Sequence, residues 1–334
     1  MLITGATGNN GQELVRQLIA LGQPIRALVR NPEEASGING PNVELAVGDF
    51  DRTETLDTAL RNIDKAFLLT PAAERFVQWQ VAFIEAAQRT GVRHLVKFSA
   101  LGAAPNTVSE LLRLHAQTDG VLRNSGLSYT ILQPNMFYQY MLSSADTIKS
   151  QGVFYLPLKN AAQSTVDIRD ICAIAAKALV EDGHERKTYV ITGPEALTFQ
   201  QVAETLSNVL GREIRYIDVP LSVAADGMRK AGMPDWNVRI VSELLDYFAS
   251  GAAATVSDAV PRLLGRPAIS FEQFAKDHRG VFQPRCSRHA VFRSEIYPPR
   301  GGLKILAQGG APAGPGFIID DCPLVPRAHK AKWI

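Results

Sequence analysis

The chain has 334 residues, a formal net charge of +2 at pH 7 and a hydrophobic content of 46%. This length suggests one large or two modest domains, and the apolar content is ample for a packed core. The small net charge argues against a nucleic-acid or membrane-surface partner, and no apolar run reaches the roughly 18 residues that a membrane span needs. Since the first residues already read as a strand, no signal peptide is expected. The cysteines, Cys172, Cys286 and Cys322, show no metal-ligand spacing and indicate a reducing, cytoplasmic compartment.

A short apolar strand at residues 2–4 runs directly into three glycines at spacing three, Gly5, Gly8 and Gly11. Leucines and isoleucines at helical spacing follow as far as Gly22, and residues 24–30 read as a second strand. This βαβ pattern predicts a dinucleotide site. Gly5 would allow the strand-to-helix turn, Gly8 the approach of the pyrophosphate, and Gly11 close packing of helix and strand. The alternative is a glycine-rich turn with no ligand.

Strand and helix patterns continue to alternate after residue 30. Strands are predicted over 43–47, 65–69, 94–98 and 128–132, and helices over 53–62, 76–90 and 108–125. Such alternation is typical of an α/β fold with a doubly wound parallel Rossmann sheet. We therefore expect an NAD(P)-binding Rossmann domain over residues 1–135.

The rhythm changes from Met136, where the segments become shorter and mixed. The patterns predict a helix over 170–180, a strand over 188–191, a helix from the capping box at Thr198 to 210, a strand over 215–219 and a short helix over 270–278. We expect residues 136–283 to form a smaller α+β substrate lobe that is interleaved with the Rossmann sheet.

Residues 284–334 do not fit either lobe. From residue 285 onward they hold six Pro, six Gly and eight Lys or Arg against three Asp or Glu, with no clear period. This composition predicts a disordered appendage. The alternative is a basic tail that binds something acidic.

With these motifs in hand, the chain resembles the NmrA-like atypical short-chain dehydrogenase/reductases, and among them the bacterial NADPH quinone oxidoreductases and triphenylmethane reductase. The resemblance covers about residues 1–283. The stretches that carry it are 4–11, 26–32, 48–49, 125–134, 166–170 and 183–189.

Cofactor preference is predicted from Arg30, nineteen residues after Gly11. NAD sites usually hold an acidic residue here for the ribose 2′-hydroxyl, whereas a guanidinium suits a 2′-phosphate. We expect NADPH, with NADH weaker. The resemblance implies an adenine contact at Asp49 and Phe50, although Asp49 could equally be a turn residue or a helix cap. It further implies cofactor contacts at Thr7, Asn9, Asn10, Leu69, Thr70, Ser99 and Asn135; Ser99 could also be a cap.

The catalytic Tyr-x-x-x-Lys pair of typical short-chain reductases is missing from the expected helix. When Asp119 is aligned with the acidic residue of the family, His115 takes the lysine position and Leu111 the tyrosine position. The chain's one Tyr-x-x-x-Lys, from Tyr155, contains Pro157, which argues against a shared helical face. His115 is the predicted catalytic residue, through a hydrogen bond to the nicotinamide ribose or through proton transfer. The alternative is an ordinary surface or core histidine.

Aromatic and methionine side chains follow the strand that ends near Pro134. Phe137, Tyr138 and Met141 are the predicted substrate contacts, because such side chains suit a flat apolar acceptor. Ordinary packing between the lobes is the alternative, and Phe137 is the residue expected to face the ligand.

Without a proton donor, the chemistry favours acceptors whose charge is delocalised or neutralised after hydride addition, such as quinones, azo compounds or triarylmethyl cations. The first prediction is an NADPH-dependent reductase of this kind, with a homodimer left open. The second is an NADP(H)-sensing regulator that acts through a protein partner. A nucleic-acid binder is disfavoured by the negative charge of the chain before the tail, and no histidine clustering supports a metal.

Overall fold

The computed structural model describes residues 1–38 and 40–284; the predicted tail lies outside them from residue 285 onward. A seven-stranded, all-parallel sheet forms the larger lobe, which confirms the predicted fold class. Its strands, in spatial order, are β3 (Val43–Val47), β2 (Ile25–Val29), β1 (Leu2–Ile3), β4 (Lys65–Leu68), β5 (His94–Phe98), β6 (Ser128–Pro134) and β8 (Lys187–Ile191).

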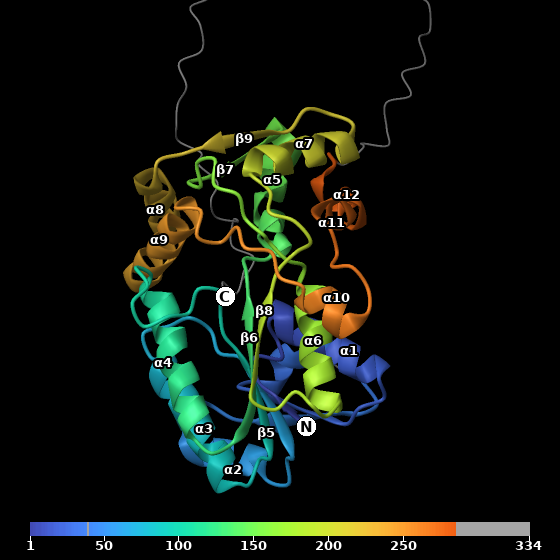
Figure 1. Ribbon diagram of the computed structural model, residues 1–334, viewed down its shortest axis with the longest axis vertical. Helices are drawn as coiled ribbons and strands as arrows, with labels where there is room; N and C mark the ends of the chain where they lie inside the picture. Colours follow the sequence, from blue (N-terminus) through green and yellow to red (C-terminus); the bar gives the residue numbers. More distant parts are fainter. Residues whose placement is uncertain (39, 285–334) are drawn as a thin grey trace, which may run out of the picture.

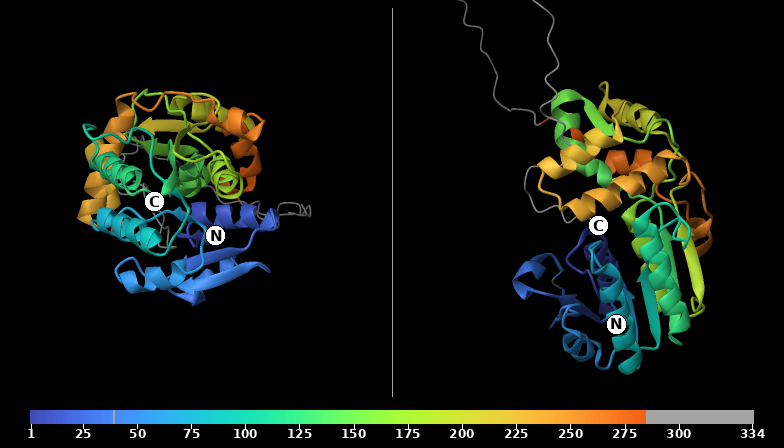
Figure 2. Two further views of the ribbon diagram at one scale, coloured as in Figure 1. Left: turned by 60° about the horizontal axis from the view of Figure 1, so that its bottom comes forward. Right: turned by 90° about the vertical axis from the view of Figure 1, so that its left-hand side faces the viewer.

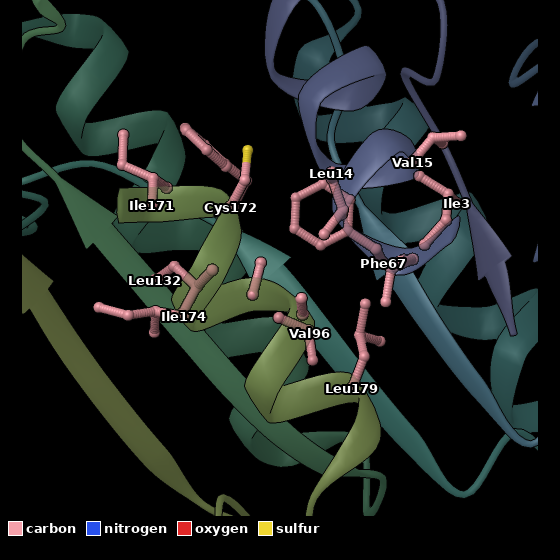
Figure 3. Packing of buried hydrophobic residues seen from close by; sticks show 14 of the residues in the cluster. Ile3, Leu14, Val15, Phe67, Val96, Leu132, Ile171, Cys172, Ile174 and Leu179 are labelled. Carbon is pink, nitrogen blue, oxygen red and sulfur yellow. The ribbon is translucent and has the colours of Figure 1, made fainter. Parts of the chain in front are cut away.

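Helices cover both faces of this sheet because alternate strand residues point to opposite sides. Helices α1 (Asn9–Ala20) and α6 (Ile168–Val180) pack on one face, where Figure 3 shows Leu14, Phe67 and Val96 together. The other face is covered by α2 (Thr53–Leu60), α3 (Phe76–Arg89) and α4 (Glu110–Asn124), as Figure 1 shows. The strand order reverses between β1 and β4, and in doubly wound sheets ligands bind at the carboxyl ends of the strands beside such a switch point.

Strand β6 is longer than predicted because it pairs with a strand from the second half of the chain. Gln133 and Pro134 lie in register with Val190 and Ile191 of β8. Segments after residue 136 therefore complete the main sheet, as expected. Helix α6 also packs against α1, and α10 (Ala259–Leu264) packs against α6 and β8.

The smaller lobe lies beyond the carboxyl ends of the strands (Figures 1 and 2). Its elements are η2 (Tyr138–Ser144), α5 (Ala145–Gln151), α7 (Phe199–Leu210), α11 (Phe271–Asp277), α12 (Arg279–Phe282) and a two-stranded sheet of β7 (Val153–Leu156) and β9 (Arg215–Asp218). Their buried faces form one core that includes Phe154, Phe199 and Phe274. The predicted capping box is present, with Thr198 accepting from the backbone of Gln201 at 3.3 Å.

Several segments were not expected from the sequence, among them η1 (Pro32–Ile38), α8 (Leu221–Lys230) and α9 (Asp235–Ala249). Helices α8 and α9 follow Pro220 and Pro234, which occupy the N-cap positions without a capping side chain. The start signal that marked α7 is therefore missing from both. They pack on each other, and α9 also packs on α4. In the described part of the chain, no helix is both long and apolar enough to cross a membrane.

Candidate functional site

The glycine loop joins β1 to α1, and its three glycines have different structural roles. Gly5 has a φ of +63°, a conformation that favours glycine, and a Cβ on Gly11 would lie 2.1 Å from the carbonyl oxygen of Gly5. The protein's own packing therefore requires both. A Cβ on Gly8 would meet only the oxygen of Gly5, at 3.4 Å, which is ordinary contact. The space beside Gly8 is thus left open, as the approach of a ligand to this backbone requires.

Helix α1 begins at this loop with free amide groups. Gly8 is its N-cap and makes no side-chain capping bond. Among the described residues, the side-chain oxygen of Asn10 is buried without a hydrogen-bond partner, while the carbonyl oxygen of Asn10 accepts from Cys172 Sγ at 3.2 Å. The side chain of Gln12 donates to the carbonyl oxygen of Thr7 at 3.0 Å and steadies the turn. The amides of Asn9, Asn10 and Gly11 and the helix dipole provide an anion site that fits the pyrophosphate of a dinucleotide.

Arg30 and the Asp49–Phe50 pair follow β2 and β3 at the same edge of the sheet. Arg30 is exposed directly after Val29, the last residue of β2, so its guanidinium is available to a ligand. The side chain of Asp49 accepts from the backbone of Asp51 at 3.0 Å, so Asp49 is a turn residue, while Arg52 is the N-cap of α2. The ring of Phe50 packs against Trp79, with ring centroids 6.3 Å apart. Adenine contact at Asp49 and Phe50 remains a prediction.

The end of β4 lies against the glycine loop. Thr4 Oγ1 donates to the carbonyl oxygen of Leu69 at 2.9 Å and accepts from its amide at 2.8 Å. The hydroxyl of Thr70 is buried and accepts from the side chain of Gln80 at 3.1 Å. Leu69 therefore lies directly against the glycine loop, whereas the Thr70 side chain is engaged by α3.

A buried polar cluster joins β5 to α4. Lys97 Nζ lies 2.7 Å from Asp119 Oδ1, and Ser99 Oγ donates to Asp119 Oδ2 at 2.8 Å. The side chains of Lys97 and Asp119 are 0% and 1% exposed. The hydroxyl of Ser99, a residue predicted as a cofactor contact or a cap, thus donates its hydrogen bond to Asp119. Lys97 was not singled out from the sequence; a lysine inside a buried central strand was the available signal, because such a charge needs a partner.

His115 lies on α4 one turn before Asp119 and is buried. Its ring meets Phe76 edge-on at 4.8 Å, and its Nδ1 has no hydrogen-bond partner among the described residues. Burial, and then the nearby charge of Lys97, lower the pKa of His115 well below its usual value, so the imidazole is neutral at physiological pH. Leu111, at the missing tyrosine position, is buried and apolar. Tyr155 lies on β7 while Lys159 sits in a turn with φ +51°, so the two share no helix, as predicted.

The predicted substrate residues separate into two groups. Phe137 is half-buried, stacks on Tyr140 at 5.4 Å and meets Phe98 edge-on at 6.0 Å, near the carboxyl end of β5. Tyr138 and Met141 are instead core residues of the smaller lobe, where Tyr138 packs against Phe271. Of the three predicted contacts, only Phe137 lies where it could meet a ligand without repacking this core.

Asn135 was predicted as a cofactor contact, but its side-chain amide is used internally. Its Nδ2 donates to Ser164 Oγ at 2.8 Å and to the carbonyl oxygen of Ala253 at 2.9 Å, and its Oδ1 accepts from the backbone of Met136. The side chain is 2% exposed, so it ties the lobes together rather than offering groups to a ligand. Within residues 1–38 and 40–284, no group of three His, Cys, Asp or Glu side chains is arranged to hold a metal ion.

The chain is similar to known proteins over most of its length. The chain is 38% identical over 282 residues to the NAD(P)H azoreductase of Xenophilus azovorans, covering 84% of this chain and 99% of the relative. The structure is similar to that of the NADPH-dependent quinone oxidoreductase of Escherichia coli complexed with NADPH, with a TM-score of 0.76, 26% identity and coverage of 83% and 98%. A triphenylmethane reductase of Citrobacter sp. complexed with NADP(H) shares the fold at 24% identity, with a TM-score of 0.75 and coverage of 83% and 99%.

Residues 1–260 match the NmrA-like family. The matched stretch includes the glycine loop, the whole main sheet and most of the smaller lobe. This match and the azoreductase relative confirm the resemblance drawn from the sequence motifs. The chain belongs to the NmrA-like family.

Proposed function

We propose that the protein is an NADPH-dependent reductase that transfers hydride to a conjugated, electron-poor acceptor such as an azo compound or a quinone. Its relatives include NAD(P)H-dependent reductases of such acceptors. The observation that carries the proposal lies on α4, where Leu111 is buried and apolar and His115 is neutral. These are the positions that we align with the Tyr and Lys of typical short-chain reductases.

The residues that would hold the cofactor follow from the geometry above. The amides at the start of α1 and the open backbone of Gly8 fit the pyrophosphate, and exposed Arg30 fits a 2′-phosphate. Leu69, which lies against Gly5, would border the path toward the nicotinamide end. When bound, the cofactor supplies the hydride.

The side chains at that end determine which acceptors can react. His115 is neutral, so it can give or take a hydrogen bond but does not serve as a charged acid at neutral pH. A simple ketone would need an acid for the alkoxide that forms. The anion formed from a quinone or an azo compound is delocalised and can take its proton from water, and a triarylmethyl cation becomes neutral on hydride addition and needs no proton. The aromatic face of Phe137 suits the flat ring system of such an acceptor.

Purified protein should be assayed for NADPH oxidation with benzoquinone, naphthoquinone, azo and triphenylmethane acceptors and with a simple ketone, against acceptor-only controls. We expect turnover with the conjugated acceptors and none with the ketone. His115→Ala should lower kcat, while His115→Gln, which keeps a hydrogen-bonding group, should retain more activity. Tight NADPH binding without turnover of any acceptor would reject the reductase and favour an NADP(H)-sensing regulator with a protein partner.

A further inference from the structure

The buried ion pair of Lys97 and Asp119 has a high desolvation cost at the centre of a sheet. Lys97 lies in β5, between β4 and β6, and both side chains are nearly inaccessible to solvent. The attraction within such a pair seldom exceeds the cost of removing both charges from water, and apolar replacements are often equally stable. Stability alone therefore does not account for a charged pair at this place.

The pair connects the parts of the chain that border the candidate site. The second carboxylate oxygen of Asp119 receives the hydroxyl of Ser99, the first residue beyond β5. The amide of Ser99 is itself fixed, since it donates to the carbonyl oxygen of Leu132 at 2.7 Å. Two residues later, Leu101 donates to the carbonyl oxygen of Pro134 at 2.9 Å and packs into the core of the smaller lobe. The start of the loop between β5 and α4 is thus locked to both lobes.

Helix α4 is held by the same contacts. Asp119 lies four residues after His115 on α4, so the two share one side of the helix. Any rotation or sliding of α4 against β5 would break the bond from Lys97 and move His115 together with Asp119. The cluster therefore sets the position of His115 relative to the carboxyl end of β5.

We propose that Lys97 and Asp119 are positioning residues, which hold Ser99 and His115 in register at the hydride-transfer end of the site. This inference rests on the proposed reductase function. Displacements near 1 Å can cost about 100-fold in rate when reacting groups must be aligned. On the proposed function, cofactor affinity depends mainly on the glycine loop and Arg30. Replacing Lys97 and Asp119 should therefore change the Kd for NADPH little.

The test compares single and paired substitutions. Lys97→Met alone leaves a buried carboxylate without its partner and should lower the melting temperature strongly. Lys97→Met with Asp119→Leu removes both charges and should recover most of that loss. We expect the double variant to keep a Kd for NADPH within about twofold of wild type, while kcat falls by about 10-fold to 100-fold.

A matched control separates positioning from lost stability. Arg266 pairs with buried Asp170 of α6 at 2.7 Å, outside the Lys97–Asp119 cluster. Arg266→Met likewise removes the charged partner of a buried carboxylate, which keeps its hydrogen bond from the backbone amide of Ile269. It should lower the melting temperature without changing kcat. If Lys97 and Asp119 act through Ser99, adding Ser99→Ala to the double variant should lower kcat no further.

The fluorescence emission of bound NADPH supplies a readout that needs no turnover. A shifted emission spectrum at unchanged Kd in the double variant would support the positioning role. It would do so even if the wild-type protein reduced no acceptor, a result that would reject only the reductase function. A folded double variant with wild-type emission and, where wild type turns over, wild-type kcat would overturn it.

Discussion

Alanine at Gly11 and alanine at Gly8 should separate folding from cofactor binding. At Gly11 a Cβ would lie 2.1 Å from Gly5 O, 2.6 Å from Gly5 C and 2.7 Å from Ala6 Cα, all backbone atoms. Non-bonded contacts need about 3.5 Å, so the loop must move by on the order of 1 Å. Overpacking of this kind costs about 1–3 kcal/mol, of which helix propensity returns up to about 1 kcal/mol. The net cost is up to about 3 kcal/mol, and at about 2–4 °C per kcal/mol we expect the melting temperature of Gly11→Ala to fall by as much as roughly 12 °C.

Gly8→Ala should behave in the opposite way. Its φ of −87° is open to any residue and its Cβ makes only an ordinary contact, so stability should stay within about 0.5 kcal/mol of wild type. The added methyl occupies the space that a pyrophosphate needs, so the Kd for NADPH should rise at least about 10-fold, or 1.4 kcal/mol.

Thermal melting and NADPH fluorescence titration measure both effects. Gly120→Ala is the matched control, because this glycine lies within α4 with open space around it and should gain about 0.5–1 kcal/mol without a change in Kd. If Gly8→Ala bound NADPH as wild type does, the assignment of the glycine loop to the pyrophosphate would be wrong.

Three further substitutions test other features. Arg30→Ala should raise the KM for NADPH about 10-fold or more and leave that for NADH nearly unchanged; equal changes would refute the 2′-phosphate contact. Because the folded-state pKa of His115 is lowered, its contribution to stability is present above about pH 6.5 and is lost as pH falls, by up to about 1.4 kcal/mol per pH unit. In His115→Phe, the free energy of unfolding measured with urea should depend less on pH between pH 5 and 7. The same pH dependence as in wild type would contradict a buried neutral imidazole. Thr198→Ala removes the cap of α7 and should cost about 1 kcal/mol in the same unfolding assay, whereas Gln200→Ala, outside the box, should cost less.

The glycine loop and most strands could be predicted because their signals are local. A glycine triplet after a strand, and short apolar runs such as 66–69, have few alternative structures. The buried cluster could not be predicted, since nothing in the local sequence says that Lys97 meets Asp119 from the next helix. The sequence pattern predicts Tyr138 and Met141 as ligand contacts, but a lobe core and an acceptor pocket select the same apolar side chains. The structure places both residues in the core of the smaller lobe, where Tyr138 packs against Phe271.

The interleaving of the two halves also governs how the chain can fold during synthesis. When residues 1–135 have left the ribosome, α1 and strands β1, β4 and β5 still present an apolar face that α6 covers in the finished protein. The edge of β6 likewise stays unpaired until β8 arrives. We therefore expect the first half of the chain to pass through a partly open state with an unpaired strand and exposed hydrophobic surface, the kind of species on which chaperones act. Residues 1–135 alone are consequently not expected to fold autonomously, although they carry the complete glycine motif.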